Sequence, residues 1–385
     1  MQNNSKNGLK VFVNKNITGA LNFENDTYIF NYKDDAKDIV SLTMPIRSAS
    51  WNSKKLHPIF QMNMPEGALK ETIKNHFSKI ETMTDINMLK LIGPYMLGRV
   101  KFEEIKDVQD NLNLDDILNS SKQNLFDELL LKFAIKSGIS GVQPKLLLKA
   151  FDKTTMKFEN YIVKSWENNY PNLALNEYFC MKACSYAKLP TPEFYISDDF
   201  KMFVMKRFDI LEDGTYLGFE DMCVLTARGV ENKYDGSYEE CARVIKDIIS
   251  PQYKKESLKI FFKSLVMNHF LKNGDAHLKN FGILYNSDFS QIFFAPAYDV
   301  VNTVVYFHKD RPALSMFGKK VWFGKKELVK FGIQNCYLNE NEANEIYELC
   351  IKALKSSIFE LEEYLKNDKS FEEIGTKMLN IWKLS

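Results

Sequence analysis

The stretch NGDAHLKN, residues 273–280, follows the apolar helical segment LKIFFKSLVMNHFL and precedes the short strand-like run FGILY. A loop between a helix and a strand can hold side chains rigidly and still leave them open to a ligand. Asp275 and Asn280 are five residues apart in this loop, and Asp299 follows the next strand-like segment. Carboxylate and amide oxygens are hard ligands of the kind that magnesium prefers, so the pattern favours a magnesium site.

The spacing of Asp275 and Asn280 equals that of the protein-kinase catalytic loop. There the aspartate accepts or orients the attacking hydroxyl, and the asparagine supplies an amide oxygen to magnesium. His277 and Lys279 in the same loop, and Asp299 after a strand, make the pattern more specific than the spacing alone. A capped turn with solvated polar residues would show the same spacing, so the loop by itself leaves both interpretations open.

A glycine-rich element, SGISGVQPK, occupies residues 137–145. Its two glycines allow close backbone approach, so consecutive amides could wrap an anion, and Lys145 could add positive charge for phosphates. Glycines of this kind also form simple turns. Lys164 lies in the apolar run YIVKSW, where a buried lysine would need a partner such as Glu177. The alternative is a solvent-facing lysine on the other face of the strand.

The order of the predicted elements suggests a small sheet followed by a helical region. Strand-like runs such as LKVFV, TYIFNY and IVSLTMPI dominate residues 9–60, and helical stretches follow at residues 65–77 and 85–91. A polar segment near residues 108–122 suggests a boundary, after which strands at LLLKAF, NYIVKSW, FYIS and KMFVMKRF surround one helix at residues 175–187. Beyond this mixed sheet the pattern turns helical. The extended MKRFD connection completes the layout of a two-lobed nucleotide-binding cleft.

Composition gives a second set of expectations. The 385 residues, 45% of them hydrophobic, are enough for two or three domains with buried cores. The net charge is only +1, which does not favour nucleic acid or an anionic membrane as a direct partner of the whole molecule. The six cysteines show no CxxC pair and no Cys/His grouping at zinc spacing. No apolar run reaches the length of a signal-peptide core or a membrane span, so we expect a cytoplasmic protein.

Six motifs in order resemble those of the HipA family of toxin kinases: GISGVQPKLLL, YIVKSW, FVMKRFD, EDMC, NGDAHLKNFGILY and FAPAYDVVNT. SLTMPIR, PIFQMNMPEG and IGPYMLGRVKF are similar to the family's N-terminal subdomain. The resemblance implies an α+β, bilobed, protein-kinase-like fold in a single chain. It also implies three parts: a β-rich N-terminal subdomain at residues 1–115, a kinase N-lobe at 120–208 and a helical C-lobe at 209–385.

By position, the resemblance implies that Asp275 is the catalytic base and that Asn280 and Asp299 bind magnesium. The nucleotide-binding residues that it implies are Ser140, Gly141, Val142, Lys145, Lys164, Lys206, Phe208, His277 and Lys279. The MKRFD segment would form the hinge against adenine, with Phe208 near the base. Lys206 stands where the family commonly has a glutamate, so an acidic contact to the nucleotide is not expected there. His277 is expected to orient its neighbours rather than to shuttle protons.

The function that the resemblance implies is that of a serine/threonine protein kinase that uses ATP and Mg2+ and stops growth. An aminoacyl-tRNA synthetase is the implied target class, and a HipB-like DNA-binding antitoxin is the implied partner. DNA would be contacted only through the antitoxin, and no membrane partner is expected. Two other functions remain open, a kinase for a lipid or small molecule and a pseudokinase that regulates transcription with its antitoxin. The intact set of candidate catalytic residues argues against the pseudokinase.

Ser140 is also the expected autophosphorylation site, because serines of the matching loop are modified in the family. Gly138 replaces the first serine of the family's Ser-Ile-Ser pattern, and Ser137, shifted by one position, is the second candidate. A phosphoserine adds about −1.5 to −2 charge, which would compete with ATP phosphates for Lys145 and the loop amides. The alternative is a Ser140 hydroxyl that only caps the turn.

Overall fold

The computed structural model describes residues 8–77, 82–103, 112–119, 122, 124–141, 143–165 and 169–385. The chain forms two compact units. Unit 1 consists of Met1–Lys164 and Arg207–Val230, and unit 2 consists of Ser165–Lys206 and Glu231–Ser385. The glycine-rich loop therefore belongs to unit 1, and the NGDAHLKN loop belongs to unit 2.

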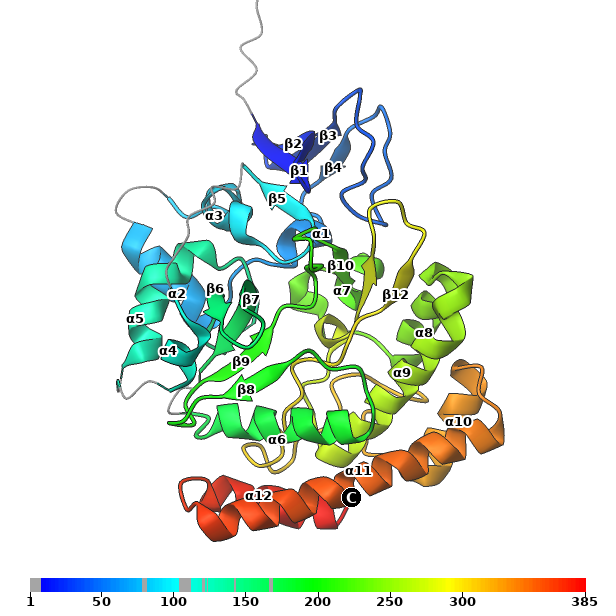
Figure 1. Ribbon diagram of the computed structural model, residues 1–385. Helices are drawn as coiled ribbons and strands as arrows, with labels where there is room; N and C mark the ends of the chain where they lie inside the picture. The colour runs from blue at the N-terminus through cyan, green and yellow to red at the C-terminus, as the bar shows by residue number, and fades with distance from the viewer. Residues whose placement is uncertain are drawn as a thin grey trace, which may run out of the picture. The chain divides into compact units, whose positions relative to one another are not determined.

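Unit 1 begins with the predicted antiparallel sheet (Figure 1). Its five strands run in the order β4-β3-β2-β1-β5. Alternation of apolar and polar residues explains the sheet, since Leu9, Val11 and Val13 of β1 are buried and the residues between them are less so. The strands are β1 (Leu9–Val13), β2 (Asn16–Glu24), β3 (Thr27–Tyr32), β4 (Trp51–Ser53) and β5 (Val100–Phe102).

The predicted strand IVSLTMPI is wrong, because this segment folds as a turn with an isolated bridge between Ser41 and Met44. Side chains, rather than a neighbouring strand, satisfy its backbone. The buried Glu220 carboxylate accepts hydrogen bonds from Ser41 Oγ and Leu42 N, both at 2.8 Å. The Tyr32 hydroxyl donates to the Met44 carbonyl. Hydrophobic alternation predicts a strand here, but the buried Glu220 carboxylate, which is distant in sequence, satisfies the polar groups of a turn instead.

The rest of unit 1 consists of short helices and a long hairpin, and the helices expected at residues 65–77 and 85–91 are confirmed. The proposed boundary at residues 108–122 lies partly outside the described residues. The elements are α1 (Pro58–Gln61), α2 (Gly67–Phe77), α3 (Asp85–Ile92), α4 (Leu114–Leu118), α5 (Leu125–Phe133), β6 (Lys145–Asp152), β7 (Lys157–Lys164), β10 (Gly218–Asp221) and α7 (Met222–Leu225).

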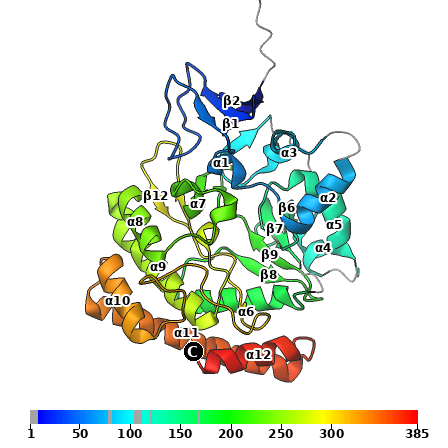
Figure 2. The same ribbon diagram turned by 180° about the vertical axis from the view of Figure 1, so that it is seen from behind.

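Unit 2 is mostly helical, and its long C-terminal helix α11 runs beside α6 and α12 (Figures 1 and 2). Two short antiparallel hairpins, β8–β9 and β11–β12, complete it. The elements are α6 (Leu173–Tyr186), β8 (Phe194–Ile196), β9 (Phe203–Lys206), α8 (Tyr238–Ile248), α9 (Pro251–Leu271), β11 (Gly282–Tyr285), β12 (Ile292–Phe294), α10 (Lys325–Asn335), α11 (Glu340–Asn367) and α12 (Glu372–Lys383).

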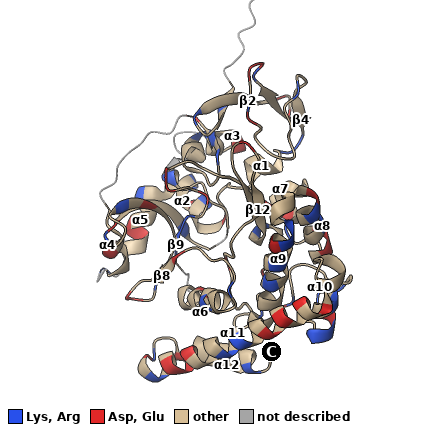
Figure 3. Ribbon diagram, turned by 45° about the vertical axis from the view of Figure 1, so that its right-hand side comes forward, with Lys and Arg blue, Asp and Glu red and all other residues tan. Residues whose placement is uncertain are grey.

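Helix α11 buries one face and exposes the other. Its buried residues recur at helical spacing, for example Ala343, Tyr347, Cys350 and Leu354. Positions occupied by basic and by acidic residues both occur along the ribbon of this helix (Figure 3). All six cysteines are buried and free, so none forms a disulfide. Within the described part of the chain, no helix has both the length and the apolar character needed to cross a membrane.

Helix α9 positions the NGDAHLKN loop. The half of α9 next to the loop is almost entirely buried, which fixes the helix in the core of unit 2. The helix ends at Lys272, whose left-handed backbone (φ 57°) redirects the chain. The Asn273 backbone N–H then donates to the Asn268 carbonyl at 2.9 Å. The loop therefore starts from a rigid support.

Candidate active site

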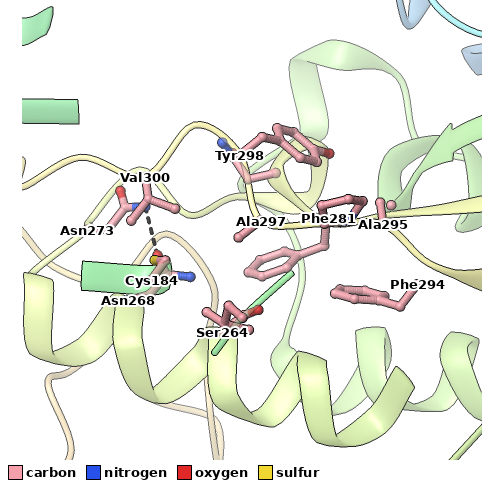
Figure 4. Close-up of a pocket in the computed structure, with 14 residues that line it drawn as sticks. Cys184, Ser264, Asn268, Asn273, Phe281, Phe294, Ala295, Ala297, Tyr298 and Val300 are labelled. Carbon is pink, nitrogen blue, oxygen red and sulfur yellow. Dashed lines mark hydrogen bonds between the residues drawn. The ribbon is translucent and has the colours of Figure 1, made fainter. Parts of the chain in front are cut away.

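Asn273 fastens the start of the loop through its side chain. Its Nδ2 donates to Asn268 Oδ1 at 2.9 Å in a buried contact, drawn as the dashed line in Figure 4. Its Oδ1 accepts a hydrogen bond from the Asp275 backbone N–H at 3.2 Å. The amide thus spans the helix end and the candidate base, so the backbone of Asp275 is held before any ligand binds.

Asn280 joins the loop to the segment that contains Asp299. Its Oδ1 accepts a hydrogen bond from the His277 backbone N–H at 3.2 Å, and its Nδ2 donates to the Asp299 carbonyl at 3.5 Å. The Tyr298 hydroxyl donates to the Lys279 carbonyl at 2.8 Å. Asp299 itself has a left-handed backbone (φ 58°), which is uncommon outside glycine and recurs at functional sites. Sequence-predicted residues of the loop and of the Asp299 segment therefore converge in unit 2.

The Asp275 carboxylate is exposed and accepts a hydrogen bond from the Tyr234 hydroxyl at 2.8 Å. Desolvation by the surrounding protein raises its pKa above the ordinary aspartate value, and the negative charges of Asp299 and Asp310 act in the same direction. The Tyr234 hydrogen bond and the Lys233 charge oppose the rise. A carboxylate whose pKa lies above its ordinary value is a better general base at neutral pH.

His277 is buried, with 7% of its surface exposed, and its ring packs edge-on against Tyr234 at 5.2 Å between centroids. Burial, followed by the charge of Lys233, lowers its pKa to about 3. The imidazole is therefore neutral at physiological pH. This agrees with an orienting role rather than a proton-shuttling one.

Two residues that the sequence reasoning missed, Thr303 and Asp310, hold the loop at Gly274. The buried Gly274 N–H donates to Thr303 Oγ1 at 2.8 Å, and the Thr303 hydroxyl donates to Asp310 Oδ2. A Cβ on Gly274 would collide with the Asp310 carboxylate and the Thr303 hydroxyl, so a larger residue would displace this hydrogen-bonded pair. The Trp322 indole N–H donates to the Asp310 carbonyl at 3.1 Å and anchors the arrangement.

The loop lies over a small cavity of about 20 Å³, lined in part by Ser264, Asn268 and Asn273 (Figure 4). That volume holds roughly one water molecule. The cavity is therefore too small for a nucleotide. Most of its lining residues are apolar, among them Phe281, Phe294 and Val300.

In unit 1, Lys145 and Lys164 lie directly opposite each other across the β6–β7 hairpin. Both are buried, with 4% and 2% of their surfaces exposed, which excludes the solvent-facing alternative for Lys164. Because directly opposite cross-strand positions share one face of a hairpin, both lysines belong to the same face. Gly141 has a φ of +124°, and a Cβ there would lie 2.4 Å from Lys145 Nζ. The glycine therefore leaves room for the Lys145 ammonium group.

The two serine candidates of the glycine-rich loop differ in their surroundings. Ser137 is fully buried, and its hydroxyl donates to the Phe133 carbonyl at 2.8 Å and accepts from the Leu147 N–H at 2.9 Å. Ser140 is half-buried. Val142, predicted to contribute a backbone amide, lies outside the described residues.

The predicted hinge lies where the chain passes from unit 2 to unit 1. The Lys206 backbone N–H donates to the Glu193 carbonyl at 2.8 Å in unit 2. Phe208 in unit 1 is half-buried and packs edge-on against Phe219, at 5.6 Å between centroids. Glu177 is fully buried in unit 2, and its pairing with Lys164 stays a prediction.

The side-chain oxygens of Asn280 and Asp299 are of a type that suits a magnesium ion bound together with a nucleotide. Among the described residues, no group of three or more His, Cys, Asp or Glu side chains is placed to hold a metal. Asn280 and Asp299 are candidates for two hard oxygen ligands, and the Asn280 Nδ2 donates to the backbone carbonyl of Asp299. Magnesium in phosphoryl-transfer sites usually takes one or two protein ligands and completes its shell with phosphates and water. Two protein ligands are therefore enough.

Comparison with known families shows to which family the chain belongs. The HipA-like C-terminal domain matches residues 137–358, more than half of the chain, and the HipA N-terminal domain matches residues 9–103. The chain belongs to the HipA family. The HipA-like C-terminal match contains the glycine-rich loop, the buried lysines and the NGDAHLKN loop, and the N-terminal match contains the five-stranded sheet.

Relatives and solved structures agree with membership of the HipA family. Two curated relatives are each named a "putative kinase". Y4dM of Sinorhizobium fredii is 22% identical over 285 residues, 68% of this chain and 66% of that protein. A Haemophilus influenzae protein is 30% identical over 186 residues, 44% of this chain and 53% of that protein. The chain thus matches between about half and two thirds of the length of these relatives.

A chain in the solved complex of Shewanella oneidensis HipA, HipB and operator DNA shares the fold. The TM-score is 0.69 at 17% identity, and the match covers 97% of this chain and 96% of that chain. The predicted HipA relationship and the α+β, kinase-like fold are therefore confirmed. The bounds of the three predicted domains stay a prediction.

Proposed function

We propose that this HipA-family, kinase-like protein is a serine/threonine protein kinase that transfers the γ-phosphoryl group of ATP to a protein hydroxyl. The observation that carries the proposal is the junction of Asp275, Asn280 and Asp299 around one anchored loop in unit 2. This junction supplies a base and two hard oxygen ligands, which in-line phosphoryl transfer needs together.

Each residue has a defined task in the proposed reaction. The acceptor oxygen attacks the γ-phosphorus, the bond to the leaving ADP oxygen breaks, and the proton of the acceptor hydroxyl passes to the Asp275 carboxylate. Asn280 and Asp299 would hold magnesium, which neutralises charge on the β- and γ-phosphates. Lys145 and Lys164 bind phosphates from the β6–β7 hairpin. Phe208 and the backbone at Lys206 receive the adenine.

The proposed partner is a HipB-like antitoxin, and DNA is reached only through it. The solved Shewanella complex, which holds HipA, HipB and operator DNA, supports this proposal. The proposed target is a protein hydroxyl, with an aminoacyl-tRNA synthetase as the class that the family resemblance favours. Phosphorylation of such a target would stop growth.

We also propose that Ser140 is autophosphorylated. Its half-buried position supports this, because the rival Ser137 is buried and both hydrogen-bonding sides of its hydroxyl are engaged. A phosphate on Ser140 would add about −1.5 to −2 charge and compete with ATP for Lys145. The modified enzyme should therefore lose ATP affinity.

Phosphoproteomics after brief induction without antitoxin tests the proposal in cells. The wild type should arrest growth and add phosphate to serine or threonine of a few proteins. Asp275→Asn should do neither, whereas Asp247→Asn, the same change at an exposed position of α8, should behave as wild type. Growth arrest by Asp275→Asn equal to that of the wild type would contradict the kinase mechanism and point to sequestration by binding.

A further inference from the structure

Tyr234 lies outside the catalytic loop, 41 residues upstream of Asp275, and touches the candidate base directly. Its hydroxyl donates to Asp275 Oδ1 at 2.8 Å, which is the one side-chain hydrogen bond to this carboxylate among the described residues. Tyr234 is 42% exposed, so the contact lies at the open side of the site. A carboxylate has two oxygens that accept hydrogen bonds, so Oδ2 remains available to an incoming hydroxyl.

Hydrogen bonds and ring packing hold the segment that contains Tyr234 against the NGDAHLKN loop. The Leu278 N–H donates to the Lys233 carbonyl at 3.0 Å, and the Tyr234 ring packs against His277. On the other side, Lys320 Nζ donates to the Tyr234 carbonyl at 2.9 Å. These contacts hold the backbone and the ring at once. The hydroxyl is therefore a fixed feature of the site rather than the end of a free side chain.

We propose that Tyr234 is a positioning residue of the reaction, whose hydroxyl fixes the rotation of the Asp275 carboxylate and directs Oδ2 toward the acceptor hydroxyl. The inference rests on the proposed kinase function. The terminal torsion of an aspartate has a broad energy profile, so an unrestrained carboxylate samples many orientations. Proton acceptance needs the oxygen within hydrogen-bond reach of the acceptor hydroxyl. A fixed donor on Oδ1 removes the unproductive orientations.

The same distance admits a different role, in which Tyr234 occupies the place of the acceptor hydroxyl and blocks the site. The two roles predict opposite changes in the reaction rate when the hydroxyl is removed. Removal of a positioning hydroxyl lowers the rate, whereas removal of a blocking hydroxyl raises it. The anchors at Lys233 and Lys320 favour the positioning role, because a blocking residue has to leave when the substrate enters.

Steady-state ADP release from Mg-ATP tests the inference without a known protein substrate, because it counts γ-phosphoryl transfer to any acceptor, water included. Tyr234→Phe removes one oxygen and keeps the ring on His277. We expect its kcat to fall roughly 10- to 100-fold, the loss typical of a misplaced catalytic group, with the KM for ATP unchanged. Tyr253→Phe, at the opposite end of α9 with its ring on Phe293, is the matched control and should equal the wild type.

Several results would overturn the inference. An unchanged kcat in Tyr234→Phe would remove the positioning role, and an increased kcat would assign the blocking role. A raised KM with unchanged kcat would place Tyr234 in nucleotide binding. A wild type that releases no more ADP than Asp275→Asn would instead reject the proposed function itself. Thermal melting of each variant, compared with the wild type, confirms that the exposed Tyr234 position tolerates the change.

Discussion

Replacement of Thr303 by valine should uncouple the catalytic loop from the segment after Asp299. Valine has nearly the shape of threonine but no hydroxyl, so Gly274 N–H loses its acceptor and Asp310 loses a donor. Thr303 is 8% exposed and Gly274 is buried, so water does not readily replace the missing partner. Asp275 follows directly after Gly274. A shift of the Gly274 backbone therefore moves the candidate base.

The size of the effect follows from these contacts. A buried donor left without a partner costs about 1–3 kcal/mol, so the free energy of unfolding of Thr303→Val should fall by about that amount. Thr303→Ser keeps the hydroxyl and loses one methyl group, worth about 0.8 kcal/mol. Thr303→Val should therefore be the less stable of the two, by up to about 2 kcal/mol. The two variants should differ strongly in rate, because a displacement of about 1 Å at the reacting atoms can cost roughly 100-fold.

ADP release and thermal melting of the wild type, Thr303→Val and Thr303→Ser measure both effects. We expect kcat to fall at least roughly tenfold in Thr303→Val and less than about threefold in Thr303→Ser, with the lower melting temperature in Thr303→Val. Equal kcat values for the two would refute the reasoning, because packing rather than the hydroxyl would then explain the role of Thr303. A lower kcat in Thr303→Ser than in Thr303→Val would refute the reasoning more strongly.

Three further predictions concern pH, nucleotide binding and control. The Asp275 carboxylate must be ionised to act as base, and its pKa is raised, so its pKa should set the acid limb of the pH–rate profile. The acid limb should move to higher pH in Tyr234→Phe, which removes a hydrogen bond that lowers this pKa, and to lower pH in Asp310→Asn, which removes a negative charge that raises it. Shifts of the same sign in the two variants would contradict this origin of the limb. Gly141→Ala should raise the KM for ATP at least roughly tenfold. Gly214→Ala, also at positive φ but with open space around it, should leave this KM unchanged. Equal KM values in the two variants would show that Gly141 does not belong to the phosphate site. Peptide mass spectrometry should find phosphate on Ser140 after incubation with Mg-ATP, and an unmodified Ser140 in active protein would reject autophosphorylation there.

Local patterns in the sequence predicted much of this molecule. The order of strands and helices follows from apolar spacing within each segment, as in β1 and α11. Asp275 and Asn280 could be found because both belong to one short loop, and Asp299 because it follows the next strand. The sequence left open whether Lys164 is buried or faces solvent, and its 2% exposure decides for burial.

Contacts between distant segments were not predictable from one sequence. Tyr234, Thr303 and Asp310 are single polar residues in loops, and no spacing links them to the residues they hold. Only the folded chain brings Thr303 to Gly274, 29 residues away. The failed strand prediction has the same cause, since Glu220 is 178 residues from the Leu42 amide that it binds.

Transfer of radiolabel from [γ-32P]ATP to the purified protein, with and without Mg2+, tests the central claim most directly. The account predicts label on serine in the wild type that depends on Mg2+ and is lost, by orders of magnitude, in folded Asp275→Gln and Asp299→Asn. Label that persists in either folded variant at the wild-type level, or that forms equally without Mg2+, would contradict it.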